Sequence, residues 1–193
     1  MRNDHIIISQ IIEPGSRVLD LGCGSGDLLA LLEKNGIKGQ GVELDEAKIY
    51  ECVAKGVSVF HMDIDSGLEG YPDQAFEYVI LNQSLQEVRN IGIVITESLR
   101  VGRRVIIGLP NFAHYAARFR LFFTGKAPMT PSLPYDWSDT PNVRFMSIKD
   151  FRRFCKSKGL RIIREIPLDL HHQARILPNL FAVNTIYLIE KAR

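Results

Sequence analysis

Three glycines stand at alternate positions near the beginning of the chain, directly after an apolar run. Run and turn together read VLDLGCGSG from Val18 to Gly26, and a helical pattern of leucines begins after Asp27. Glycines at such a turn allow positive φ and let a ligand approach the backbone, while the helix start offers unpaired N–H groups. A strand-to-helix turn without a ligand does not need three glycines. We therefore predict that a polar ligand binds at this turn.

The glycine spacing and two nearby carboxylates indicate the kind of ligand. A dinucleotide fingerprint reads GxGxxG, whereas the third glycine here comes one residue early and Asp27 stands where that glycine would fall. Asp20 and Asp27 would repel a pyrophosphate in a partly buried site. They would attract the sulfonium and ammonium groups of S-adenosylmethionine, which has no phosphate. The prediction is S-adenosylmethionine, or S-adenosylhomocysteine, rather than NAD.

Two further acids follow the next two apolar runs. In GVELD, Glu43 comes about 20 residues after the glycines, where a carboxylate can accept hydrogen bonds from both hydroxyls of a ribose. In HMDID, Asp63 is placed to bind an adenine amino group, with the amide of Ile64 opposite a ring nitrogen. Two alternatives stay open. Glu43 could be a surface acid opening the next helix, and Asp63 a turn residue bonded to its own backbone.

Amides rather than a base follow the fourth apolar run, where Asn82, Gln83 and Ser84 stand in sequence. Amides can bind an acceptor or the methionine portion of the cofactor, but they cannot take a proton at neutral pH. Methyl transfer depends mainly on proximity and orientation, so the lack of a base does not exclude it. No catalytic residue is assigned.

Two other kinds of active site find little support. Ser25 does not stand in a GxSxG elbow, which argues against acyl transfer by a serine nucleophile of this chain. The pair His171-His172 has no second ligand pair at metal spacing, so no metal site is predicted.

The motifs require a sheet that brings their strand ends together. Short β-branched runs alternate with stretches of helical period, which predicts an α/β fold with a parallel sheet covered by helices. Seven strands are expected, at Arg17 to Leu21, Gly39 to Leu44, Val57 to His61, Phe76 to Leu81, Arg103 to Leu109, Leu160 to Pro167 and Ala182 to Ile189. Helices are expected at Asp4 to Ile12, Asp27 to Asn35, Glu46 to Ala54, Ile91 to Arg100 and Ile148 to Ser157.

Regularity breaks at residues 110–145, which hold more than half of the nine prolines and many aromatic residues. Because a linker would be polar, we expect an insertion that packs against something. Its candidate functional residues are Asn111, His114, Tyr115, Arg118, Arg120 and Arg144. Three interpretations stay open: a lid with a cationic lining for a carboxylate-bearing acceptor, a short helix covering the sheet with solvated arginines, or a partner-docking surface.

Composition limits the remaining possibilities. The 193 residues, 46% of them hydrophobic, suit a single domain, 1–193. Because 24 basic residues balance 22 acidic ones, we predict no nucleic acid partner and no membrane partner. Three cysteines without CxxC spacing suit a reducing compartment, and neither a signal peptide nor a transmembrane run is seen. The expected location is the cytoplasm.

In this order and at these separations, VLDLGCGSG, GVELD, HMDID and YVILNQSLQEV resemble the cofactor motifs of class I S-adenosylmethionine-dependent methyltransferases. The resemblance implies a Rossmann-like, three-layer α/β/α fold with a mostly parallel seven-stranded sheet. The predicted cofactor-binding residues are Asp20, Gly22, Cys23, Gly24, Gly26, Glu43, Leu44, Asp63, Ile64, Asn82 and Gln83.

Further strings narrow the resemblance. ILNQSLQEV from Ile80, LPNF from Leu109, LPYDW from Leu133 and DTPN from Asp139 are similar to the methionine-biosynthesis protein MetW family over almost the whole chain. That resemblance implies a methyltransferase-like protein that works with homoserine O-acyltransferase, of the MetX type. Two roles follow: an accessory or regulatory subunit, and, as the alternative, an active methyltransferase on a small metabolite.

Overall fold

A seven-stranded sheet forms the centre of the molecule, in the order β3-β2-β1-β4-β5-β7-β6. In this computed structural model, residues 2–169 and 172–192 are described, so His171 of the histidine pair lies outside them. The strands are β1 (Arg17–Leu21), β2 (Lys38–Glu43), β3 (Val59–His61), β4 (Phe76–Asn82), β5 (Gly102–Pro110), β6 (Leu160–Leu168) and β7 (Asn184–Lys191). The first five run parallel, and β7 is antiparallel to both β5 and β6.

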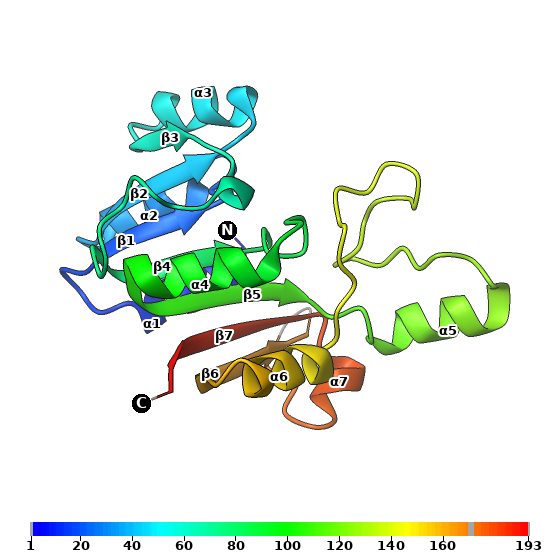
Figure 1. Ribbon diagram of the computed structural model, residues 1–193. Coiled ribbons are helices and arrows are strands. Elements are labelled where there is room, and N and C mark those ends of the chain that lie inside the picture. The colour runs from blue at the N-terminus through cyan, green and yellow to red at the C-terminus, as the bar shows by residue number, and fades with distance from the viewer. Residues whose placement is uncertain (1, 170–171, 193) are drawn as a thin grey trace.

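Helices cover both faces of this sheet, which gives the three layers visible in Figure 1. One face carries α1 (Asn3–Ile11), α2 (Asp27–Lys34) and α3 (Glu46–Ala54), and the other carries α4 (Ile91–Val101) and α6 (Ile148–Ser157). Alternation along the strands separates the two cores. In β1, Val18 packs with the first group of helices, whereas Leu19 and Leu21 pack with the second.

The predicted fold class is confirmed, and the sequence signals lie close to the observed boundaries. The strand at β1 and the helices α3 and α6 have the predicted bounds, and the largest strand error is at β7, which begins and ends about two residues later than predicted. Local capping explains two of the helix starts. Asp45 accepts a hydrogen bond from the Ala47 amide at 2.8 Å, and Ser147 forms a capping box with Asp150. The sequence prediction missed two short elements, the 3-10 helix η1 (Ile64–Ser66) and α7 (Pro178–Phe181).

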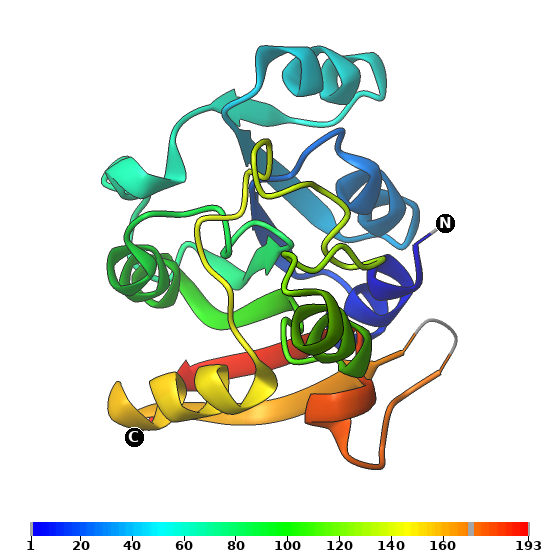
Figure 2. The same ribbon diagram turned by 90° about the vertical axis from the view of Figure 1, so that its right-hand side faces the viewer.

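The segment between β5 and α6, residues 111–147, contains α5 (Tyr115–Thr124) and a long loop. Figure 1 shows α5 projecting beyond the carboxyl ends of the parallel strands, so the interpretation of a helix covering the sheet is wrong. In Figure 2, which looks onto those strand ends, the loop after α5 passes across the edge of the sheet. It is fastened there because the amides of Val143 and Arg144 both donate to the Gln86 carbonyl at 3.0 Å.

Candidate functional site

The glycine turn joins β1 to α2 and is shaped by backbone contacts with the neighbouring strands. Gly22 and Cys23 both donate their amides to the Val42 carbonyl, at 2.8 and 3.1 Å. A Cβ on Gly22 would lie 2.7 Å from the Cβ of Ser84, so the turn can press against the end of β4 only with glycine there. Gly24 has φ of 55° and open space where a Cβ would point, so its backbone remains approachable from outside.

Two cysteines fill the space beneath this turn. The Sγ atoms of Cys23 and Cys52 lie 3.9 Å apart, and the Cys52 thiol donates to the Gly24 carbonyl at 3.1 Å. A Cβ on Gly41 would lie 2.5 Å from the Cys23 Sγ, which shows how tightly the sulfur is packed against β2. Burial, with the nearby Asp20 charge, raises the pKa of the Cys23 thiol far above its usual range. The side chain therefore supports the turn and is a poor nucleophile.

Glu43 lies at the carboxyl end of β2 and reaches across to the glycine turn. One carboxylate oxygen accepts the Gly24 amide at 2.7 Å, and the other accepts the amides of Leu44 and Asp45 at 2.9 and 3.0 Å. Three of roughly four lone-pair positions are thus in use. A ribose binding to Glu43 would share or replace the Gly24 contact. The half-buried carboxylate is held by backbone groups rather than standing as a solvated acid at a helix start.

Asp20 points into the layer between the sheet and the first group of helices. Its side chain is 2% exposed, and its Oδ1 has no hydrogen-bond partner among the described residues. Burial, together with repulsion from Glu43, raises the pKa of Asp20 to about 7. A buried acid without a partner is costly, and a nearby cation would lower that cost.

The end of β4 gathers amide side chains with unpaired atoms. The Asn82 amide donates to Asp4 at 2.9 Å, and Asp4 is paired with Arg2 at 2.6 Å. The Asn82 Oδ1, the Gln83 Nε2 and the Gln86 Oε1 are buried and have no partner in the described part of the chain. Gln83 also has positive φ, at 62°, which is uncommon for a residue other than glycine. Strain and unpaired polar atoms together mark binding sites more often than structural turns.

The acid after β3 fills a structural role in this structure. Asp63 is exposed, and its Oδ1 accepts the Asp65 amide at 2.9 Å, which caps η1. Asp65 in turn accepts the amides of Arg89 and Asn90 at 2.9 to 3.0 Å. Because Glu43 and His61 are register partners in β2 and β3, Asp63 and Ile64 follow at the same edge of the sheet as Glu43. The local arrangement matches the turn-residue interpretation of Asp63, and an adenine contact remains a prediction.

The structure thus brings the ends of β1, β2 and β4 together, with the end of β3 at the outer side. It does not leave Asp27 as a second charge for a cationic ligand, because Asp27 pairs with Lys55 at 2.7 Å and accepts the Ser25 hydroxyl at 3.0 Å. Ser84 is likewise occupied, since its hydroxyl donates to the Leu21 carbonyl at 2.7 Å. The electrostatic argument for a cation therefore rests on Asp20.

Two residues of this edge were not singled out from the sequence. Gln86 lies in the same NQSLQEV string as Asn82 and donates its amide to the Gln83 carbonyl at 2.7 Å. Its helix-like spacing from Gln83 was a usable signal. Asp4 comes from α1, and only the packing of that helix against β4 reveals the contact with Asn82.

Several polar residues of segment 111–147 are used in hydrogen bonds that hold the segment together or fasten it to neighbouring elements. Asn111 donates to the Ala182 carbonyl at 2.8 Å, and Arg118 donates to the Ala113 carbonyl at 2.6 Å. His114 caps α5 by accepting the Ala116 amide at 3.3 Å, and burial lowers its pKa, which keeps the ring neutral. Arg144 donates to the Arg89 carbonyl at 2.6 Å. These contacts do not form the cationic lining of an acceptor lid.

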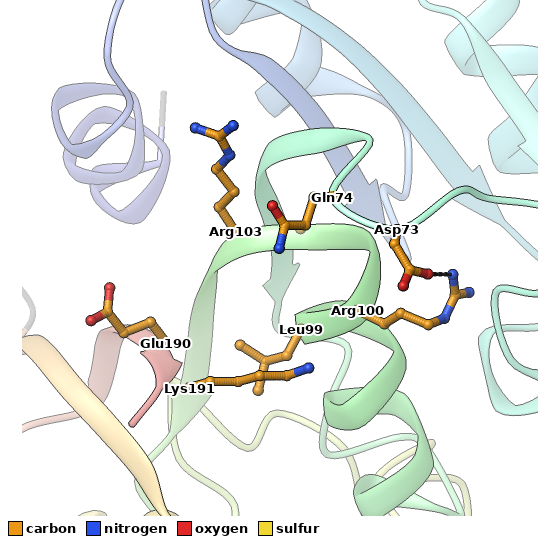
Figure 3. Close-up of a pocket in the computed structure, with 8 residues that line it drawn as sticks. Asp73, Gln74, Leu99, Arg100, Arg103, Glu190 and Lys191 are labelled. Carbon is orange, nitrogen blue, oxygen red and sulfur yellow. Dashed lines mark hydrogen bonds and ion pairs between the residues drawn. The ribbon is translucent and has the colours of Figure 1, made fainter. Parts of the chain in front are cut away.

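A cavity of about 350 Å³ opens at the opposite edge of the sheet, near the amino ends of β4 and β5. Figure 3 shows its wall, in which Arg100 and Asp73 form an ion pair. The lining also includes Arg103 and Glu190. It shares no residue with the glycine turn or with the ends of β2 and β4. Ligands of open α/β sheets bind outside the carboxyl ends of the strands. We therefore assign the candidate site to the glycine turn together with the carboxyl ends of β2, β3 and β4, and we call this region the glycine edge.

Comparisons with known proteins show the family to which the chain belongs. The model of the family described as methionine biosynthesis protein MetW matches residues 2–189. The chain belongs to the MetW family. It is 37% identical over 186 residues to the bifunctional methionine biosynthesis protein MetXA/MetW of Rhodopirellula baltica, with 91% of this chain and 30% of that relative covered. The chain thus spans about a third of the length of that relative.

Solved structures show the same architecture as this MetW-family chain. An S-adenosylmethionine-dependent methyltransferase from Mesorhizobium loti matches with a TM-score of 0.72 and 16% identity, covering 96% of each chain. A possible histamine N-methyltransferase from Thermotoga maritima matches with a TM-score of 0.70 and 15% identity, covering 97% of this chain and 87% of that one. At these identities the likeness shows the methyltransferase fold alone.

None of the helices in ranges 2–169 and 172–192 has the length and apolar character needed to cross a membrane. Within the same ranges, no three His, Cys, Asp or Glu side chains gather in a group that could hold a metal ion.

Proposed function

We propose that this protein binds S-adenosylmethionine at the glycine edge and acts in methionine biosynthesis as an accessory or regulatory subunit of a MetX-type homoserine O-acyltransferase. The observation that carries the binding proposal is the buried Asp20, whose Oδ1 has no partner among the described residues, beside a turn whose Gly24 backbone is open. A ligand with positive charge and hydrogen-bonding groups would compensate both. Such a role would place the protein in the cytoplasm.

Different residues of the glycine edge would bind different parts of the cofactor. Glu43 would accept the ribose hydroxyls, with Leu44 beside it, and Asp63 and the Ile64 amide would take the adenine. Gly22, Cys23, Gly24 and Gly26 would form the backbone cradle, and Asp20 would lie near the positive charges. The Asn82 Oδ1 and Gln83 Nε2 are buried and have no partner within residues 2–169 and 172–192, and they fit the ammonium and carboxylate groups of the methionine portion. When bound, the cofactor would supply an activated methyl group and a positive charge.

The accessory role rests on what surrounds this site. Asn82 and Gln83 cannot take a proton, and His114 is engaged in capping α5. The relative from Rhodopirellula baltica carries both names, MetXA and MetW, in one chain. A fused chain keeps its two parts at high effective concentration, which supports an association between the separate proteins.

Cofactor binding is tested by calorimetry with S-adenosylmethionine, S-adenosylhomocysteine and NAD. We expect the first two to bind and Gly24→Val to abolish their binding, because valine cannot adopt positive φ without strain. Gly36→Val is the matched control, since Gly36 also has positive φ and open space and lies at the far end of α2. Binding of NAD alone would overturn the ligand assignment.

The accessory role is tested by co-purification with the acyltransferase and by assaying acylation of homoserine with and without this protein. We expect a complex and a changed rate of acylation. No complex together with no change in rate would exclude the role.

The alternative, an active methyltransferase on a small metabolite, is favoured by the Asn82 Oδ1 and the Gln83 Nε2, which have no partner among the described residues and could orient an acceptor. It predicts formation of S-adenosylhomocysteine with homoserine or its acyl esters. Tight cofactor binding without turnover of any candidate acceptor would count against it.

A further inference from the structure

Helix α5 carries an exposed aromatic face, formed by Tyr115, Phe119, Phe122 and Phe123. The side chains of Phe122 and Phe123 are 82% and 70% exposed. Positions 115, 119 and 122 to 123 fall at i, i+4 and i+7 to i+8, so the rings line one side of the helix. This is the spacing of the anchors that a helix uses when it lies in the apolar groove of another protein.

The aromatic face is ordered without being covered. Among the described residues, α5 makes no extensive contact with another helix or strand, and Figure 1 shows it standing away from the sheet. The rings contact one another instead. Phe119 and Phe123 stack with centroids 5.6 Å apart, and Phe122 meets Phe123 edge-on at 5.0 Å. Tyr115 contacts Phe181 at 6.1 Å, at the base of the helix.

The base of α5 is held firmly by the polar contacts already described, those of Asn111, His114 and Arg118. Arg118 also donates to the Asn179 carbonyl at 3.3 Å, which ties the helix to α7. A fixed helix presenting a fixed aromatic face loses little conformational freedom on binding, which favours affinity.

The charges around the aromatic face indicate what covers it. Residues 115–127 contain Arg118, Arg120 and Lys126 and no acidic residue. In a symmetric pair of copies, a surface meets itself, so like charges would face each other across the interface. A partner with carboxylates around an apolar groove would instead complement this surface.

We propose that the aromatic face of α5 docks into an apolar, acid-rimmed groove on the homoserine O-acyltransferase. This inference rests on the proposed function and assigns the surface that carries it. Because β1 and β5 both run parallel to β4, α5 follows β5 at the same edge of the sheet as the glycine turn. A partner held by α5 therefore lies on the cofactor side of the molecule.

The test measures binding of the purified acyltransferase by calorimetry to wild type, Phe122→Asp, Phe123→Asp and Arg120→Glu. Tyr50→Asp is the matched control, because Tyr50 is an aromatic residue on α3 with 73% exposure. We expect a loss of affinity of about 100-fold for each phenylalanine variant, as at interface hot spots, and a smaller loss for Arg120→Glu. Tyr50→Asp should stay within about twofold of wild type. Cofactor binding should be unchanged in all four, which shows that they fold.

The outcomes separate this inference from the function on which it rests. If wild type and both phenylalanine variants bind the acyltransferase equally, the docking surface is wrong and the accessory role stands. If wild type forms no complex and leaves acylation unchanged, the role itself fails. A wild-type dimer in sedimentation that Phe122→Asp dissociates would assign the face to a second copy. Binding to phosphatidylcholine–phosphatidylglycerol vesicles that Phe122→Asp removes would assign it to lipid. Either result would overturn the proposal.

Discussion

The glycine edge and segment 111–147 differ in the kind of group that they leave without a contact. At the glycine edge, buried polar atoms of Asp20, Asn82 and Gln83 have no partner among the described residues. In segment 111–147, Asn111 and Arg118 are used in structural hydrogen bonds, and several aromatic rings are exposed to water. Unpaired polar atoms inside a protein call for a small polar ligand, whereas exposed aromatic rings call for a macromolecular surface. The two proposed binding regions thus differ in chemistry, although they lie at the same edge of one sheet.

The largest expected effect concerns Asp20. It tests whether ionisation of this buried acid lowers the free energy of unfolding. The folded-state pKa is raised from 3.8 to about 7, so the folded protein holds a proton that the unfolded chain has released between these values. Stability contributed by the protonated form is complete below pH 4 and is lost as the pH rises through 7. The loss amounts to roughly 4 kcal/mol at full burial.

We expect Asp20→Asn to remove most of this pH dependence, as measured by urea unfolding between pH 4 and pH 8. Asp45→Asn, at an exposed cap, is the comparison. If wild type and Asp20→Asn show the same slope of stability against pH, Asp20 is not a buried acid of this kind. Cofactor affinity in wild type should increase over the same range, because a cation pairs better with the ionised carboxylate.

The next effect separates a ligand-binding role of Glu43 from a purely structural one. Glu43→Ala removes the acceptor of two charge-assisted hydrogen bonds to a ribose, each worth about 1.5–3 kcal/mol. S-adenosylhomocysteine should then bind about 100-fold more weakly in calorimetry. Glu46→Ala, at the exposed start of α3, should bind as wild type does. Equal affinities for Glu43→Ala and wild type would show that Glu43 only holds the turn.

The smallest effect concerns the anchoring of segment 111–147. Asn111→Ala removes the side-chain hydrogen bonds to the buried Ala182 carbonyl and from the Ala113 amide. This loss should lower the free energy of unfolding by about 1–3 kcal/mol. Acyltransferase binding should weaken because α5 is no longer fixed, while cofactor affinity should be retained. A parallel loss of cofactor affinity would mean that the two regions are not independent.

Sequence reasoning reached the glycine edge because its motifs follow parallel strands. Once β1, β2 and β4 are recognised as neighbours, the residues after them must meet, whatever their separation along the chain. Sequence reasoning was less successful where long-range packing decides which side chains pair with one another. The pairing of Asp27 with Lys55, and of Asn82 with Asp4, depends on how α3 and α1 settle on the sheet. The aromatic spacing of α5 is the same for a covered helix and an exposed one, so its orientation was not predictable.

The contact beneath the glycine turn has a consequence for the history of this family. The Cys23 sulfur occupies the volume that a side chain at Gly41 would need, although Cys23 lies in the turn after β1 and Gly41 lies on β2. Neither can grow unless the other shrinks. Among homologous sequences, positions 23 and 41 should therefore change together, with alanine at 41 accompanied by glycine at 23. Such paired substitutions would show that β2 and the turn after β1 have stayed in contact in the homologous proteins.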